Sequence, residues 1–81
     1  MGKDILGCQL VVGDIILFHS KRKGRMFPGR VVEFIKGDCM GIERGYFLRS
    51  GEVNFFKEPE LTVEFSTQVV RADSLKPLVV V

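Results

Sequence analysis

Short apolar runs broken by glycine set the pattern of this sequence. Nine glycines divide the 81 residues into pieces dense in Val, Ile, Leu and Phe, which is the composition of short strands. No window of about twelve residues carries a glycine-free apolar stripe at helical spacing, so we expect no long helix. The pattern predicts an all-β domain, with strands over residues 9–19, 29–36, 39–49, 52–56, 62–66 and 68–70.

The connection between the third and fourth of these strands carries a hairpin signal. Ser50-Gly51 predicts a two-residue turn in which glycine supplies the positive φ that the second turn position requires. In that register Arg49 faces Glu52 and Leu48 faces Val53. An opposite-charge pair and an apolar pair both stabilise such a hairpin.

The clearest alternation lies in residues 62–66, where Val63 and Phe65 share one face and the polar residues share the other. A small domain has few other large side chains with which to fill its interior. We therefore expect most aromatic residues in the core, namely Phe18, Phe34, Phe55 and Phe65, with Tyr46 as a further candidate.

Five or six short strands are too few for a two-sheet sandwich of ordinary size. They suit a small, strongly bent barrel in which glycines and bulges turn the corners. Residues 72–75 predict a single helical turn, and residues 77–81 predict a closing strand that begins with proline.

Two segments resemble a known fold family. The stretch VGDII (residues 12–16), a basic loop and the stretch FPGRVV (residues 27–32) resemble the opening of SH3-like barrels of the Tudor, PWWP and KOW type. The resemblance implies that residues 1–81 form one SH3-like barrel of five to six strands with a short 3₁₀ turn. Small barrels with a segment similar to residues 56–61 also occur among phage-encoded proteins. This fold carries many activities, so the resemblance implies little about function.

Tudor and PWWP domains that read methylated lysine hold the cation on the faces of about three aromatic rings. By the resemblance, Phe27 takes a cage-like position, Met26 stands where PWWP domains have an aromatic residue, and either Tyr46 or Phe47 lies on the next strand. The chain has no Trp. The cage is therefore incomplete, and methyl-lysine reading is not the favoured function.

A basic segment is the sharpest feature of the chain. Its 12 Lys and Arg exceed its 10 Asp and Glu by only two, but four cations fall within residues 21–25, in a predicted loop over residues 21–27. Long basic side chains on a loop suit phosphate contacts better than base reading. The predicted nucleic-acid contacts are Lys21, Arg22, Lys23, Arg25 and Arg30. A solvated loop and a loop that binds an acidic protein are the alternatives.

A second function class is a protein-interaction module, either Tudor-like or docking on a host factor. Its motivation is a surplus of apolar residues that cannot all be interior. Phe55 and Phe56, for example, point to opposite faces of a strand. The predicted partner-binding residues are Met26, Phe27, Tyr46 and Phe56.

Catalytic, metal and cofactor sites are not predicted. His19 is the only histidine and has no cysteine or carboxylate cluster beside it in the sequence, and Asp14 fits a backbone turn better than catalysis. Cys8 and Cys39 form no CxxC pair and are expected to be free thiols in an intracellular protein. No apolar run approaches the length of a membrane span. We therefore expect neither an enzyme nor a membrane protein.

The apolar end of the chain raises the question of assembly. A strand over residues 77–81 either closes the barrel against residues 11–17 or pairs with a second copy to form a homodimer. We expect closure within the chain and a monomer, because SH3-like barrels commonly finish with such a strand.

Overall fold

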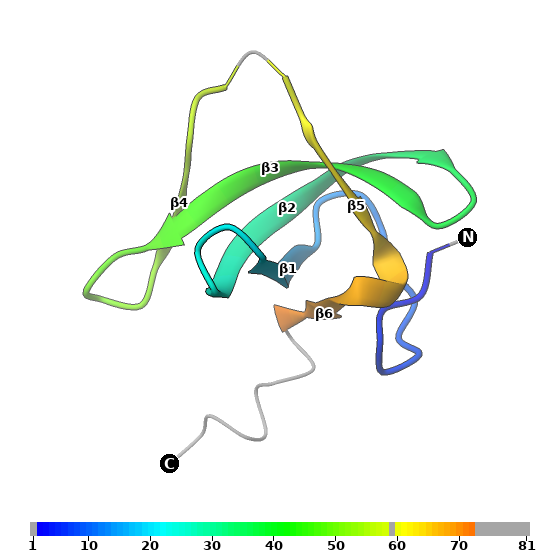
Figure 1. Ribbon diagram of the computed structural model, residues 1–81, viewed down its shortest axis with the longest axis horizontal. Coiled ribbons are helices and arrows are strands. Elements are labelled where there is room, and N and C mark those ends of the chain that lie inside the picture. Colours follow the sequence, from blue (N-terminus) through cyan, green and yellow to red (C-terminus); the bar gives the residue numbers. More distant parts are fainter. Residues whose placement is uncertain (1, 59, 73–81) are drawn as a thin grey trace.

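The protein is an all-β domain, as the sequence predicts. A computed structural model describes residues 2–58 and 60–72 (Figure 1). These residues form six strands and a 3₁₀ turn: β1 (Ile15–Ser20), β2 (Arg25–Lys36), β3 (Cys39–Phe47), β4 (Val53–Phe55), β5 (Thr62–Phe65), η1 (Ser66–Gln68) and β6 (Val69–Arg71). The described 3₁₀ turn thus precedes the last described strand, while most of the turn predicted at 72–75 lies outside the described residues.

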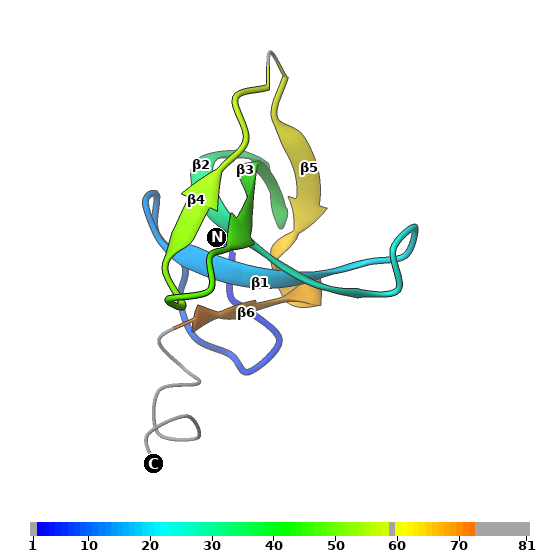
Figure 2. The same cartoon turned by 90° about the vertical axis from the view of Figure 1, so that its left-hand side faces the viewer.

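All strand pairs are antiparallel and follow the order β4-β3-β2-β1-β6, with β5 added on β3. Strand β3 is shared, because Cys39–Ile42 pair with β5 and Gly45–Phe47 pair with β4. The sheet bends so that β1 and β6 run across the direction of β3, β4 and β5 (Figure 2). Pairing among the described residues does not close the sheet, so the barrel stays a prediction. The predicted closing strand, residues 77–81, lies outside the described residues, and the choice between closure and homodimer stays open with it.

The core lies on the concave side of the bent sheet. It consists mainly of aliphatic side chains, and the half-buried Phe27 and Phe34 pack against it. Phe18 is buried as predicted, whereas Phe65 is exposed, so its assignment to the core was wrong. Tyr46, the further candidate, is exposed as well. The buried hydrophobic residues are Leu10, Ile16, Phe18, Val31, Met40, Ile42 and Val69.

Strand β5 presents its apolar face outward, which reverses the expectation for its alternation. Val63 is 56% exposed and Phe65 is 53% exposed. The register explains this orientation, because Thr62 lies opposite Ile42 and Glu64 lies opposite Met40. Residues directly opposite each other share a face of the sheet, and both of those β3 residues are fully buried. The polar side of β5 therefore faces the concavity.

The first hairpin is longer than predicted. Strand β2 begins at Arg25 rather than at Gly29, and only residues 21–24 form the turn, which Gly24 completes with φ +66°. Met26 and Phe27 are therefore strand residues. Strand β1 begins at Ile15, and the bend before it is held by the carboxylate of Asp14, which accepts a hydrogen bond from the backbone N–H of Val11 at 2.8 Å.

The hairpin between β3 and β4 has a three-residue loop instead of the predicted two-residue turn. Phe47 pairs with Val53, and the N–H of Leu48 donates to the carbonyl of Glu52 at 2.8 Å. The predicted register was therefore wrong by one residue. Gly51 does adopt the expected positive φ, at +90°. A loop of three residues with glycine at the left-handed position is a common hairpin connection.

Candidate functional site

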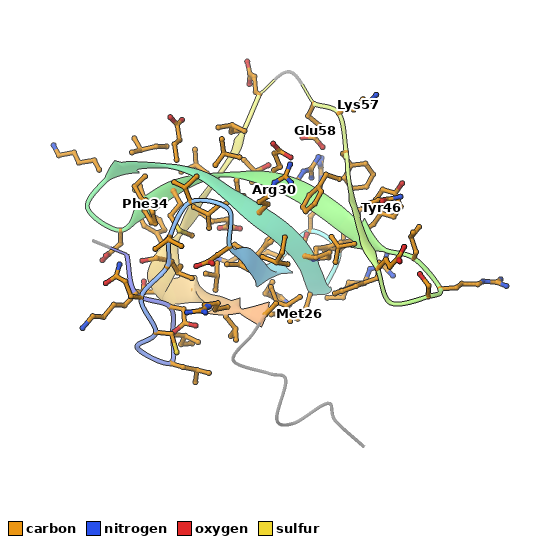
Figure 3. All side chains as sticks on the ribbon, turned by 180° about the vertical axis from the view of Figure 1, so that it is seen from behind. Met26, Arg30, Phe34, Tyr46, Lys57 and Glu58 are labelled. Atoms are coloured by element: carbon orange, nitrogen blue, oxygen red, sulfur yellow. The ribbon has the colours of Figure 1, made fainter. Side chains whose placement is uncertain are left out.

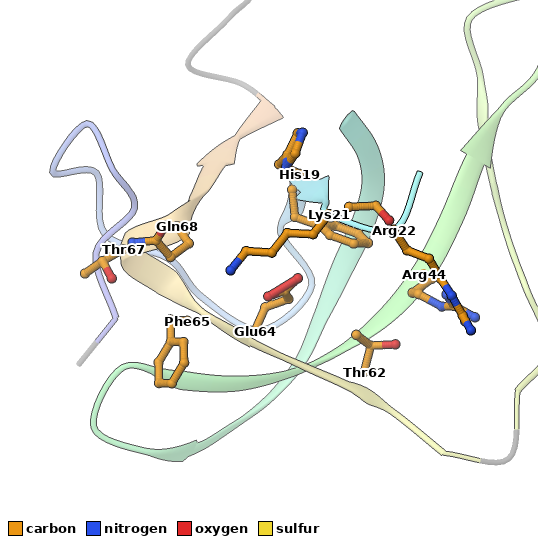
Figure 4. Close-up of a pocket in the computed structure, with 11 residues that line it drawn as sticks. His19, Lys21, Arg22, Arg44, Thr62, Glu64, Phe65, Thr67 and Gln68 are labelled. Atoms are coloured by element: carbon orange, nitrogen blue, oxygen red, sulfur yellow. The ribbon is translucent and has the colours of Figure 1, made fainter. Parts of the chain in front are cut away.

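A groove of about 810 Å³ opens on the concave side of the sheet. The end of β1 and the turn after it form one wall, and β5 with the 3₁₀ turn forms the other. Three cations line it, Lys21 and Arg22 from the turn and Arg44 from β3. Figure 4 shows Lys21 reaching toward Glu64, while Arg22 and Arg44 lie together at the other side of the groove.

A smaller cavity of about 200 Å³ adjoins this groove. The two share Phe18, Ser20, Arg22 and Arg44 in their linings. The smaller cavity is the more aromatic, because Phe27 and Phe56 line it together with Phe18. Lys23 and Glu58 complete its charged rim. Cations and rings that are far apart in the sequence therefore meet in one place.

Arg44 is the functional candidate that sequence reasoning missed. It lies on β3 opposite Gly29, so its side chain rises on the concave face. The carboxylate of Glu58 accepts hydrogen bonds from its Nε at 3.1 Å and its Nη2 at 2.5 Å, and the ring of Phe56 lies 6.0 Å from its guanidinium carbon. A lone arginine between Glu43 and Gly45 gives no signal in the sequence. Only the strand pairing brings it to the basic turn.

Glu64 is a carboxylate inside the cationic groove. Burial raises its pKa above the usual range for glutamate, and the positive charge of Lys21 partly opposes that rise. Since desolvation is the larger cause, the charged form of Glu64 is less stable in the groove than it would be in water. The groove is therefore basic at its turn and acidic at β5.

The structure brings most of the predicted basic residues together. Lys21, Arg22 and Lys23 are exposed on the turn. Arg25 stands on β2, with its guanidinium carbon 5.0 Å from the centre of the Phe27 ring. These four cations and the ring lie at one end of the β1–β2 hairpin.

Arg30 does not join them. Side chains alternate along β2, so Arg30 points away from the face that carries Arg25 and Phe27. Its Nη2 lies 2.7 Å from Oε2 of Glu43, and its guanidinium carbon lies 4.4 Å from the ring of Phe55. It lines neither cavity. The expectation that Arg30 extends the basic patch finds no support in this geometry.

The predicted partner-binding residues also divide between the two faces of the sheet. Phe27 and Phe56 line the smaller cavity, and Tyr46 packs on Phe56 with ring centres 5.0 Å apart. Met26 is exposed opposite His19 and lies on the other face of β2. Figure 3 shows Met26 and Arg30 at separate positions along β2, with Tyr46 beside β4.

A second missed residue, Asp4, is structural. Its buried carboxylate accepts hydrogen bonds from the N–H groups of Leu6, Cys8 and Arg71 at 2.8–2.9 Å. It thereby ties the N-terminal loop to β6, which flanks β1. Its sequence neighbours give no signal of this role, because Arg71 lies 67 residues away.

Within residues 2–58 and 60–72, no group of three or more His, Cys, Asp or Glu side chains is placed to hold a metal ion. The same part of the chain contains no helix that is long and apolar enough to cross a membrane. No protein-family model matches the chain, and neither a curated protein nor a solved structure matches it significantly.

Proposed function

We propose that this protein is a non-enzymatic nucleic-acid-binding module that holds phosphates with the turn at residues 21–24 and with Arg44. The observation that carries the proposal is the convergence of Lys21, Arg22 and Arg44 on one groove. Closely spaced cations from two elements match the closely spaced charges of a phosphate backbone. Phosphate contacts of this kind position a nucleic acid without reading its sequence.

The test is fluorescence anisotropy with labelled oligonucleotides at several salt concentrations. Each phosphate neutralised on a single strand contributes about −0.7 to the slope of log affinity against log salt, so contacts by the groove cations predict a slope of roughly −2 to −3. Replacing Lys21, Arg22 and Lys23 together with Gln should flatten that slope and weaken binding at least tenfold.

A matched variant separates the site from bulk charge. Lys3, Lys36 and Arg49 are exposed cations outside both cavities, and their replacement with Gln removes the same net charge. This variant should keep most of the affinity and slope. Equal losses in the two triple variants, or no salt-dependent binding at all, would contradict the proposal.

The second candidate function is a protein-interaction module. The outward apolar face of the sheet favours it, because Ile35 and Val63 are each more than half exposed and line neither cavity. Pull-down from a lysate with and without nuclease distinguishes the two functions. A contact that survives nuclease and is lost in an Ile35→Thr, Val63→Thr double variant supports the protein partner. A contact that nuclease removes supports the nucleic acid.

A methyl-lysine reader is a weaker candidate. Arg25 already stands near the ring of Phe27, and Arg44 near that of Phe56. A further cation would meet these positive charges at the rings that should attract it.

A further inference from the structure

The smaller cavity combines an aromatic lining with a charged rim. Phe18, from β1, is buried, and its ring centre lies 6.4 Å from that of Phe27, on β2. Phe56, which follows β4, is 46% exposed and contributes the third ring. Three separate segments therefore line a space of about 200 Å³.

The rim of this cavity is suited to an anion. Arg22 and Lys23 reach it from the turn, and Arg44 reaches it from β3. Glu58 is the carboxylate on the rim, and it is hydrogen-bonded to Arg44. The cavity thus has aromatic rings inside and an excess of positive charge at its mouth. A nucleotide carries the two groups that match these features, a planar base and a phosphate.

A double helix is poorly suited to such a cavity, because its paired bases expose only their edges in the grooves and keep their ring faces stacked on one another. A single strand can turn one base out and stack it on aromatic side chains. We infer that the ligand is single-stranded nucleic acid, one base of which enters the cavity and stacks on Phe56 while its phosphates lie on Arg22, Lys23 and Arg44. This inference rests on the proposed function and adds the class of nucleic acid.

Three probes of equal length test it: a labelled oligo-dT strand, a duplex, and an abasic strand that keeps the phosphates but lacks the bases. Oligo-dT should bind at least tenfold tighter than either of the others. Phe56→Ala should weaken oligo-dT binding by about tenfold, the loss expected for one stacked base, and leave the salt slope unchanged. Phe47→Ala is the matched control, since Phe47 is 53% exposed but lines neither cavity.

A second variant gives a direct signal. The chain has no Trp, so Phe56→Trp introduces a single indole at the mouth of the cavity. A base stacked on the indole should quench its fluorescence, whereas the duplex and the abasic strand should not. A Phe47→Trp control should not respond to any probe.

The outcomes separate the two levels of the proposal. Equal salt-dependent binding of all three probes, with Phe56→Ala neutral and the Phe56→Trp signal unchanged, overturns the single-strand inference and leaves the phosphate-binding function standing. Absence of salt-dependent binding to every probe overturns both.

Discussion

Two arginine–glutamate pairs stand on opposite faces of the same sheet, each beside a phenylalanine ring. Arg30 pairs with Glu43 near Phe55, and Arg44 pairs with Glu58 near Phe56. Their exposure is similar, with side-chain values of 42% and 33% for the first pair and 48% and 30% for the second. Local chemistry and burial therefore do not distinguish them.

Their positions do. Glu43 is the direct cross-strand neighbour of Arg30, so this pair belongs to the regular β2–β3 ladder. Glu58 instead reaches Arg44 from the segment after β4, at the rim of the smaller cavity. An arginine is therefore a binding candidate because of the cavity that it lines. The ion pair and the ring contact that it makes are not sufficient evidence by themselves.

The largest effect is expected from Gly45→Ala, which perturbs both pairs at once. A Cβ at this position would lie 2.6 Å from the backbone oxygen of Asn54 and 3.1 Å from Cδ1 of Phe55. Strand β4 must shift, and the neighbouring rings Phe55 and Phe56 must shift with it. The free energy of unfolding in urea should fall by about 1–3 kcal/mol, as for other overpacked sites.

Gly41→Ala is the control for that change. The nearest atom to its added Cβ is the side-chain end of Leu61, at 2.9 Å, which can move more easily than backbone. If Gly45→Ala proves no more destabilising than Gly41→Ala, β4 does not hold the two rings in place.

The next largest effect is expected on oligonucleotide affinity, where the two arginines should differ. Arg44→Ala should weaken oligonucleotide binding by about tenfold and reduce the salt slope by about 0.7, because one phosphate contact is lost. Arg30→Ala should change affinity less than about twofold. Both variants should unfold within about 1 kcal/mol of the parent protein, since exposed ion pairs contribute little to stability. Equal binding losses for the two variants would remove the distinction between the faces.

A smaller effect should come from the carboxylates. The carboxylate of Glu58 accepts hydrogen bonds from the Arg44 guanidinium. Its negative charge therefore lies where a phosphate must approach Arg44. Glu58→Gln should therefore raise oligonucleotide affinity about two- to fivefold in the anisotropy assay, a gain of up to about 1 kcal/mol, which is typical of one exposed ion pair. Glu43→Gln should leave affinity unchanged. A loss of affinity in Glu58→Gln would show that Glu58 positions Arg44 for the ligand.

The smallest effect concerns pH and Glu64. Burial raises the pKa of this carboxyl in the folded protein above its ordinary value of 4.5. Protonation is thus more favourable in the folded state, so its stabilising effect is present below the unfolded pKa and is lost as the pH rises through the folded pKa. Glu64→Gln should stabilise the fold by less than about 1 kcal/mol at pH 7 and change nothing near pH 3, as measured by urea unfolding at both values. A variant that is less stable at pH 7 would assign Glu64 a favourable contact, with Lys21 as its partner.

Sequence periodicity predicted the strands well and their orientation less well. The runs of Val, Ile and Phe placed six strands, and Asp14 and Gly51 formed the bends expected of them. For β5 the alternation was real, but a period of two does not say which face is buried. That choice depends on the register with β3, which places Thr62 and Glu64 opposite the buried Ile42 and Met40.

The candidate site was predictable only where its residues are adjacent in the chain. Lys21, Arg22 and Lys23 stand out as a run of charge, whereas Arg44 depends on a register with β2 that no local pattern encodes. Arg30 shows the converse relation between sequence and structure. It is close to the basic run in sequence but points to the opposite face of β2.

The division of β3 between two partners has a consequence for hydrogen exchange. Strands β4 and β5 are three and four residues long, and each pairs with a different part of β3, whereas β2 spans twelve residues between β1 and β3. Short strands held along one side open at a lower free-energy cost than the centre of a sheet. Amide protons of β4 and β5 should thus exchange through local opening, whereas those that join β2 and β3 should exchange only when the whole domain unfolds. Phe56 and Glu58, which follow β4 and line the smaller cavity, therefore lie beside a strand that opens before the centre of the sheet.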